Sequence, residues 1–293
     1  MHRLAAGVLM LLSLSARALS TATASASKAS ATVSKASAYL KVVRANNNAA
    51  VAADAARRFV VDGTSVGRVL EQSAAALGRY PEMFTIDEHS VTLREEAGDT
   101  PEARTAALKP VIEDLRASGT VPMLDGWRDE AFAIRTSFFA EPALTVERAA
   151  AGLFGAPQYG VFVTGYVEDA DGVPTHVWLG KRATSKPTWP GLLDCLAAGG
   201  MAAGEMPAAA IRKEAAEEAG VTPSLAAHIR PAGGVAYNGF DQTRWALKRD
   251  VLYTFDLRCP ADFEPVAVDG EVTRCYSNPR EASSALVWPR CLS

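Results

Sequence analysis

Residues Gly199 to Val221 read GGMAAGEMPAAAIRKEAAEEAGV and join a glycine-rich start to an alanine-rich, acidic end. The composition predicts a loop over 197–204, followed by a helix from near Pro207 to a stop at Gly220. Proline is favoured in the first turn of a helix and glycine just beyond the last. The two predicted ends of this helix are therefore mutually consistent.

The predicted helix carries Glu214, Glu217 and Glu218 at positions i, i+3 and i+4. At 100° per residue their side chains fall within a sector of about 100°, where like charges repel. A divalent cation would remove this repulsion, and carboxylate oxygens suit Mg²⁺ or Mn²⁺. A solvated acidic face accounts for the same pattern. The glutamates alone leave these two interpretations open.

The composition is that of a globular protein, since 48% of the 293 residues are hydrophobic and 22% are charged. The net charge of −3 is unevenly distributed: residues 1–53 contain six Lys or Arg and no Asp or Glu. The other 24 of the 30 basic residues and all 33 acidic residues follow this segment. An acidic body disfavours nucleic acid and an anionic membrane as partners. We therefore expect neither as the main partner, and the sequence leaves the oligomeric state open.

The cysteines show no pattern of disulfide or metal chemistry. They have no C-x-x-C pairing and no metal-ligand spacing with the four histidines, so we expect free thiols. These cysteines are Cys195, Cys259, Cys275 and Cys291.

The N-terminal segment has the composition of a targeting leader. Residues 1–20 start with basic residues, continue through an apolar stretch too short to span a bilayer, and end in small residues, as in a secretory signal peptide. Residues 21–38 are almost entirely Ser, Thr and Ala with two lysines, which is typical of an organellar transit peptide. We expect a disordered bipartite leader over 1–53 that directs the protein to a plastid. Secretion or mitochondrial import is the alternative.

The rest of the chain divides into two patterns, and we predict a domain in each. Residues 54–155 mix short strands and helices, with one helix starting after Thr100 as its cap. Residues 156–274 alternate strands with the acidic helix and contain a hairpin signal at Asp171-Gly172. This order predicts an α/β (α+β) fold with a mixed sheet. Strands are expected at 161–167, 176–179 and 251–257, and residues 59–64 are expected to form a strand that runs into a turn.

Counted from Gly199, the sequence has five residues, Glu205, seven residues and then KEAAEEAGV. This resembles the Nudix box, G-x5-E-x7-R-E-U-x-E-E-x-G-U with U aliphatic, except that Lys213 stands at the arginine position. Lysine keeps the charge but loses the planar fork of arginine. The resemblance implies the Nudix fold, a mixed sheet sandwiched between helices, and hydrolysis of a diphosphate with Mg²⁺ or Mn²⁺. By position it implies catalytic and metal-binding roles for Glu214, Glu217 and Glu218, and supporting roles for Gly199, Gly200, Glu205 and Lys213.

An acid outside the box often assists in this family. The segment Asp269-Gly270-Glu271-Val272 is the best source of such an acid, with Glu271 as a metal ligand or catalytic base. An ordinary Asp-Gly turn with an exposed glutamate explains the same segment equally well.

The resemblance extends over about residues 55–274 to a subgroup with an N-terminal domain, which includes plant Nudix proteins and the Nudix half of fungal thiamine pyrophosphokinase fusions. It implies hydrolysis of thiamine diphosphate and, preferentially, its oxo and oxy analogues to the monophosphate plus phosphate. Trp127, Arg128 and Trp189 become candidates for contacting the organic moiety. For Trp127 and Arg128, a core tryptophan beside a salt-bridged arginine is the alternative. After Val272 the likeness ends, and residues 275–293 form an atypical tail.

Three other functions compete with this interpretation. Isopentenyl diphosphate isomerase shares the fold, but its catalytic cysteine would fall at Ala198, where no thiol can donate a proton. A catalytically impaired Nudix module could bind a nucleotide or a partner protein. A Nudix hydrolase of nucleoside diphosphate derivatives is the third alternative.

Overall fold

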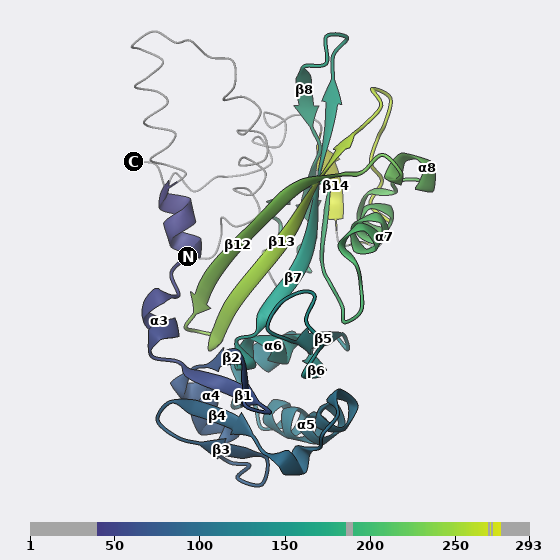
Figure 1. Cartoon of the computed structure of the whole chain (residues 1–293). Helices are drawn as coiled ribbons and strands as arrows, with labels where there is room; N and C mark the ends of the chain where they lie inside the picture. The colour runs from purple at the N-terminus through teal and green to yellow at the C-terminus, as the bar shows by residue number, and fades with distance from the viewer. Residues whose placement is uncertain (1–39, 186–189, 269, 271, 277–293) are drawn as a thin grey trace.

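A four-stranded sheet organises the first half of the chain in this computed structural model, which describes residues 40–185, 190–268, 270 and 272–276 (Figure 1). Its strand order is β2-β1-β4-β3, with β1 parallel to β4 and the other neighbours antiparallel. The strands are β1 (Arg57–Val61), β2 (Thr64–Val69), β3 (Phe84–Ile86) and β4 (Ser90–Leu93). Residues 59–64, expected to form a strand that runs into a turn, are the end of β1, a turn at Asp62-Gly63 and the first residue of β2.

Several helices of this half share a buried core with that sheet. α5 (Pro101–Ala117) starts as predicted, because the Thr100 side chain accepts a hydrogen bond from the Ala103 amide at 3.1 Å. α5 and the sheet enclose a cluster of buried residues that includes Phe59, Leu108 and Phe154, here called the N-terminal core. The remaining helical segments are residues 40–46, α3 (Ala50–Asp54), α4 (Glu71–Leu77), η1 (Glu95–Ala97), η2 (Pro122–Gly126), η3 (Arg148–Ala150) and α6 (Ala151–Phe154).

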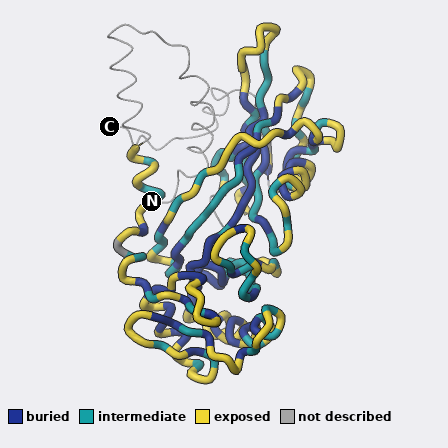
Figure 2. Tube along the Cα trace, in the orientation of Figure 1, coloured by how far each residue is buried: buried dark blue, intermediate teal, exposed yellow. Residues whose placement is uncertain are grey.

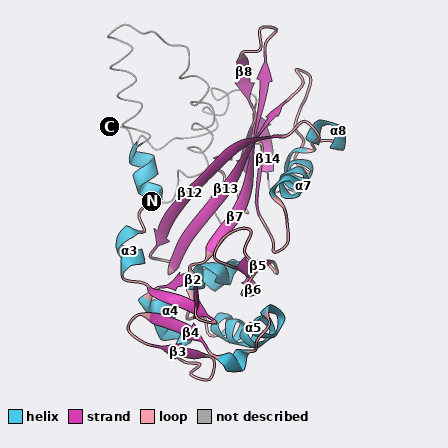
Figure 3. Ribbon diagram, viewed as in Figure 1, coloured by secondary structure: helices cyan, strands magenta, loops and turns pink. Residues whose placement is uncertain are grey.

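The second half contains a larger mixed sheet of order β11-β7-β13-β12, with β8 also paired to the end of β7, on the edge opposite β13 (Figure 3). β13 runs parallel to β7, and the other pairs are antiparallel. These strands are β7 (Pro157–Glu168), β8 (Pro174–Val177), β11 (Ala197–Gly200), β12 (Arg230–Asp241) and β13 (Ala246–Arg258). Two short sheets add β5 (Ala131–Ile134) with β6 (Leu144–Glu147), and β9 (Leu179–Arg182) with β10 (Leu193–Asp194) and β14 (Val272–Tyr276). The expected α/β class with a mixed sheet is confirmed.

α7 (Pro207–Ala219) packs along one face of this sheet, and the short α8 (Pro223–Ala226) follows it (Figure 1). Ile211 and Ala215 of α7 are fully buried against Val161 and Phe255 of the strands. This cluster is here called the sheet core, and Figure 2 shows its buried residues where β7 and α7 face each other. Alanine on the inner side of α7 allows the helix to lie close to the strands. The helix begins and ends where the sequence predicted.

Two sequence expectations about this sheet need correction. Residues 197–204 were expected to form a loop, but the first four are β11, paired with β7 from Ala197↔Val163 to Gly200↔Gly160. The strand expected at 251–257 extends over all of β13, and it pairs with β12, which was not anticipated. In both places hydrogen bonding to a neighbouring strand outweighs the weak strand propensity of glycine and alanine.

The two halves are joined beyond the chain connection. Ala246 of β13 belongs to the N-terminal core. Asn48 exchanges hydrogen bonds with the backbone of Phe240, at 2.8 and 3.3 Å. Leu247 packs with Ala49 beside α3. The loop end of the β12–β13 hairpin is thus held by residues that lie about 190 positions earlier in the chain.

Some expectations fall outside the described residues. These are the leader up to residue 39, Cys291 and the tail from residue 277. Cys195, Cys259 and Cys275 are free thiols, as expected. Within the described ranges, no helix is long and apolar enough to cross a bilayer.

A close backbone contact between β2 and the end of α6 gives the first prediction. Gly155 has φ +52°, and a Cβ there would collide with the Arg68 carbonyl oxygen, whereas Gly63 has φ +72° and open space around it. We expect Gly63→Ala to cost about 1 kcal/mol from the left-handed backbone alone. Gly155→Ala should cost about 1–3 kcal/mol more, from overpacking. Urea unfolding measures both, and equal losses would contradict the contact.

Candidate functional site

The candidate site lies where α7 crosses the edge strand β11. β11 pairs only with β7 within the described sheet, so its other edge is free of strand partners there. Successive residues of a strand point to opposite faces. Gly199 presents the face on which α7 lies, and Gly200 presents the opposite face.

The glutamates of α7 have unequal environments. Glu218 is buried, and its Oε2 accepts a hydrogen bond from the Ala198 amide at 2.8 Å. The side chain of Glu214 is 15% exposed and lies directly over Gly199. Glu217 is exposed. Two of these carboxylates are therefore turned toward β11, which a fully solvated acidic face would not explain.

Gly199 makes this arrangement possible. A Cβ at Gly199 would overlap the Glu214 carboxylate, so this carboxylate can lie where it does only over a residue without a side chain. The sequence marked Gly199 as a site residue through the box resemblance alone. The structure gives it a specific steric role.

Lys213 joins the two acids that flank it. Its Nζ lies 2.8 Å from Glu205 Oε1 and 3.4 Å from Glu214 Oε1. Glu205 also accepts the Ala202 amide at 2.9 Å, which fixes the turn before α7. The hydrogen bond that Lys213 donates to Glu205 raises the pKa of Lys213. Lys213 thus spans Glu205 and Glu214 with a single ammonium group.

Burial and the neighbouring charges shift the pKa values of Glu214 and Glu205 in opposite directions. Burial raises the pKa of Glu214, and the charges of Glu217 and Glu205 add to this effect while Lys213 opposes it. Burial also acts to raise the pKa of Glu205, but hydrogen bonds from Lys213 and the Ala202 amide lower it overall. The site therefore holds one carboxylate, Glu214, that is destabilised when ionised.

The donor set fits a hard divalent cation in chemistry and charge. Glu214, Glu217 and Glu218 offer carboxylate oxygens on one helix, and their mutual repulsion is what a cation would relieve. Among the described residues no three His, Cys, Asp or Glu side chains already converge as a ready metal site. Ligation by all three glutamates requires side-chain movement, which the exposed Glu217 can make.

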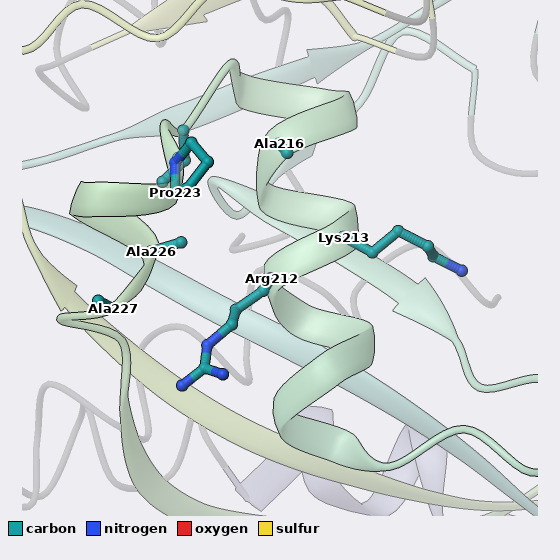
Figure 4. A pocket seen from close by; sticks show the side chains of 7 residues that line it. Arg212, Lys213, Ala216, Pro223, Ala226 and Ala227 are labelled. Atoms are coloured by element: carbon teal, nitrogen blue, oxygen red, sulfur yellow. The ribbon is translucent and has the colours of Figure 1, made fainter.

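The outer side of α7 is chemically different. A hollow of about 380 Å³ between α7 and α8 is lined by Arg212, Lys213, Ala216, Pro223 and neighbouring apolar residues. Figure 4 shows Arg212 extending from α7 toward α8, while the Lys213 side chain extends to the other side of the helix. Lys213 therefore borders this hollow as well as the acidic side of α7.

One neighbour of the glycine strand was not anticipated as a site residue. The guanidinium of Arg148, at the end of β6, lies against Gly200 from the face opposite α7. The contact joins positions 52 residues apart, and no local spacing signals it. The only sequence signal was that Arg148 belongs to a segment that shares the subgroup likeness.

The predicted organic-moiety residues lie apart from this strand or outside the described residues. Trp127 packs on the N-terminal core, with the Arg116 guanidinium 4.3 Å from its ring and its Nε1 donating to Asp129 at 2.7 Å. It borders a hollow of about 500 Å³ with Glu113, Arg116 and Asp129. Arg128 is exposed, and its amide donates to Glu147. Trp189 and Glu271 lie outside the described residues.

Residues 157–290 match the NUDIX domain, and residues 38–158 match a domain of unknown function, DUF4743. The chain belongs to the Nudix family. Nudix hydrolase 20, chloroplastic, of Arabidopsis thaliana is 38% identical over 223 residues, which cover 73% of this chain and 58% of that protein. Nudix hydrolase 24, chloroplastic, of the same plant is 39% identical over 216 residues, covering 73% and 57%. The chain thus spans somewhat more than half the length of these Nudix relatives.

The chain is also similar to part of a solved structure. The crystal structure of a Caenorhabditis elegans Ap4A hydrolase binary complex covers 44% of this chain and 85% of its own, with 15% identity and a TM-score of 0.32. The box from Gly199 to Val221 falls inside the matched Nudix segment, and Arg148 falls inside the DUF4743 segment. Both segments therefore meet at β11.

The raised pKa of Glu214 gives a prediction for the metal-free protein. A carboxyl with a raised pKa binds its proton more tightly folded than unfolded, so its ionisation weakens folding as pH rises. We expect Glu214→Gln to unfold about 1–3 °C above wild type at pH 8, with the gain shrinking toward pH 4. Mg²⁺ should reverse the order of the two unfolding temperatures, because it should stabilise the wild type more than Glu214→Gln.

Thermal unfolding with and without chelator tests this expectation. Glu217→Gln is the matched control, because Glu217 is exposed on the same helix. A gain for Glu214→Gln that does not depend on pH would contradict the burial of an ionised Glu214.

Proposed function

We propose that the protein is a Nudix hydrolase that cleaves a phosphoanhydride bond of a small-molecule diphosphate with Mg²⁺ or Mn²⁺. The observation that supports this most directly is the position of two carboxylates against β11: Glu214 lies over Gly199, and Glu218 accepts the Ala198 amide. Buried acids held in this way are costly unless a cation offsets their charge. The Nudix match over 157–290 supports the same conclusion.

In this proposal each residue of the box has a separate task. Glu214, Glu217 and Glu218 hold the cation, which supplies charge neutralisation to the diphosphate and an activated water. The Ala198 amide fixes the Glu218 carboxylate, and Glu205 holds Lys213 at 2.8 Å. Lys213 in turn orients Glu214 with one ammonium where the family pattern has a guanidinium fork.

The proposed hydrolysis is tested by removing the exposed carboxylate of Glu217, which the fold does not need. Glu217→Gln removes ligand charge from an exposed position, so folding should be unaffected while Mg²⁺-dependent diphosphate hydrolysis falls about 10²-fold or more. Phosphate release with Mg²⁺ measures it. The matched control is Glu88→Gln, an exposed glutamate of the N-terminal half. Full activity in Glu217→Gln, or in excess chelator, would refute the assignment.

For the substrate we propose thiamine diphosphate and, preferentially, its oxidised oxo and oxy analogues, cleaved to the monophosphate plus phosphate. The support is the likeness of residues 55–274 to the subgroup with these substrates, together with the DUF4743 match before the Nudix domain. Trp127 is a candidate contact for the organic moiety, because it is half-buried and borders a hollow. Nucleoside diphosphate derivatives are the second candidate class.

A substrate panel distinguishes these classes. Oxythiamine exchanges a pyrimidine amino donor for a carbonyl acceptor, and one mismatched buried hydrogen bond costs about 1–3 kcal/mol, or roughly 5- to 150-fold in kcat/KM. We expect the oxidised analogues to have the higher kcat/KM. Trp127→Ala should reduce this preference, and Phe139→Ala, which removes an exposed ring, should not.

The same panel contains the results that would overturn the substrate assignment. Equal efficiency on normal and oxidised thiamine diphosphate would remove the proposed selectivity. A clear preference for ADP-ribose or a nucleoside triphosphate would support the second class. Absence of hydrolysis with every compound would favour a module that binds a nucleotide or a partner protein.

We also propose a plastid location. It is supported by the acid-free, hydroxyl-rich composition of residues 21–38 and by the chloroplastic names of the two Arabidopsis relatives.

A further inference from the structure

The Gly199-Gly200 pair of β11 is flanked by opposite charges on its two faces. On the face of α7, the Glu214 carboxylate covers Gly199. On the other face, a Cβ at Gly200 would lie 2.8 Å from both Cζ and Nη2 of Arg148, and 3.0 Å from the Phe132 ring. An acid from the Nudix segment and a cation from the DUF4743 segment therefore meet across a two-residue strand edge.

The Arg148 guanidinium is held firmly on one side. Its Nη1 donates to Glu130 Oε2 at 2.8 Å, and its Cζ lies 5.3 Å from the centre of the Phe132 ring. The Arg148 amide also donates to the Glu130 carbonyl at 2.8 Å. These contacts fix the side chain before any ligand arrives.

The segment that carries Arg148 is itself braced. The carboxylate of Glu147 accepts hydrogen bonds from the amides of Arg128, Glu130 and Ala149 at 2.8, 3.3 and 3.2 Å. The Ala203 amide donates to the Ala131 carbonyl at 2.9 Å, which ties β5 to the turn after β11. The position of Arg148 relative to β11 is therefore set by backbone contacts from both segments.

The other side of the guanidinium keeps open donors. Within the described part of the chain, Nε and Nη2 of Arg148 have no hydrogen-bond acceptor, and neither is a buried unpartnered atom. The side chain is 39% exposed. A guanidinium with one edge anchored and the other open suits an oxyanion, because arginine binds phosphate through parallel N–H groups.

We propose that Arg148 binds the diphosphate of the substrate from the face of β11 opposite Glu214, so that the N-terminal segment completes the site of the Nudix segment. This inference rests on the proposed function. In the described sheet β11 pairs only with β7, so a ligand at its other edge need not displace a strand to contact both sides. Gly200 leaves room for the guanidinium at that edge, just as Gly199 leaves room for Glu214.

Binding of methylenediphosphonate in the presence of Mg²⁺ tests this role without relying on turnover, because its bridging carbon is not hydrolysed. Titration calorimetry on the full chain should show binding to wild type and about 10- to 100-fold weaker binding to Arg148→Met. Arg148→Lys should be weakened severalfold, since it keeps the charge and loses the fork. The matched control Arg79→Met, an exposed arginine of the N-terminal half, should bind as wild type does.

Glu130→Gln separates ligand binding from a purely structural clamp. It removes the ion pair but leaves the guanidinium, so binding should stay within about threefold of wild type. Equal losses in Glu130→Gln and Arg148→Met would overturn the proposal, as would unchanged binding in Arg148→Met or no binding to wild type. Should Arg148→Met unfold at a lower temperature than wild type, the binding of methylenediphosphonate to Arg148→Lys decides the proposal. A severalfold loss supports it, and binding equal to wild type contradicts it. Arginine-dependent binding without hydrolysis of any diphosphate would refute the proposed function and leave this inference standing.

Discussion

The contact between α7 and β11 is the constraint on which the candidate site depends. The Ala198 amide holds the Glu218 carboxylate, and the absence of a side chain at Gly199 lets Glu214 lie on the strand. Burying a carboxylate is unfavourable unless hydrogen bonds or a counter-charge offset the lost hydration. The sheet core supplies the apolar contacts that hold α7 in place, through Ile211 and Ala215. The acidic side of the helix is therefore positioned by packing on its apolar side.

Local sequence signals were sufficient for α7 but not for its partner strand. Proline at the start and glycine at the end mark a helix by backbone chemistry that does not depend on the rest of the fold. β11 consists of two alanines and two glycines, which have low strand propensity, and it is a strand because β7 lies beside it. β12 could not be predicted for the same reason. Its residues 230–239 include three glycines and a proline, which have low strand propensity, and they form a strand because β13 lies beside them.

The candidate site shows a similar division. The i, i+3, i+4 spacing predicted that the three glutamates share a helix sector, and the box resemblance marked Glu205 and Lys213. Neither could show that Glu218 is buried while Glu217 is exposed, because that depends on which side of α7 meets the sheet. The neighbourhood of Arg148 and Gly200 depends on how β6 is brought to β11, which is a long-range property. The shared packing of Ala246 and the Asn48–Phe240 pairing belong to the same class of long-range contact.

Charge balance around β11 connects these observations. Lys213 is the cation nearest to Glu214, yet it lies closer to Glu205, at 2.8 Å against 3.4 Å. The pKa of Glu214 accordingly stays raised, because burial and the charges of Glu217 and Glu205 outweigh the single ammonium. An arginine at position 213 could engage both acids through separate N–H groups, whereas lysine must divide one point charge between them. The departure from the family pattern thus keeps the total charge but gives Glu214 the longer of the two contacts to Lys213, and a divalent cation at α7 would supply the counter-charge that Glu214 lacks.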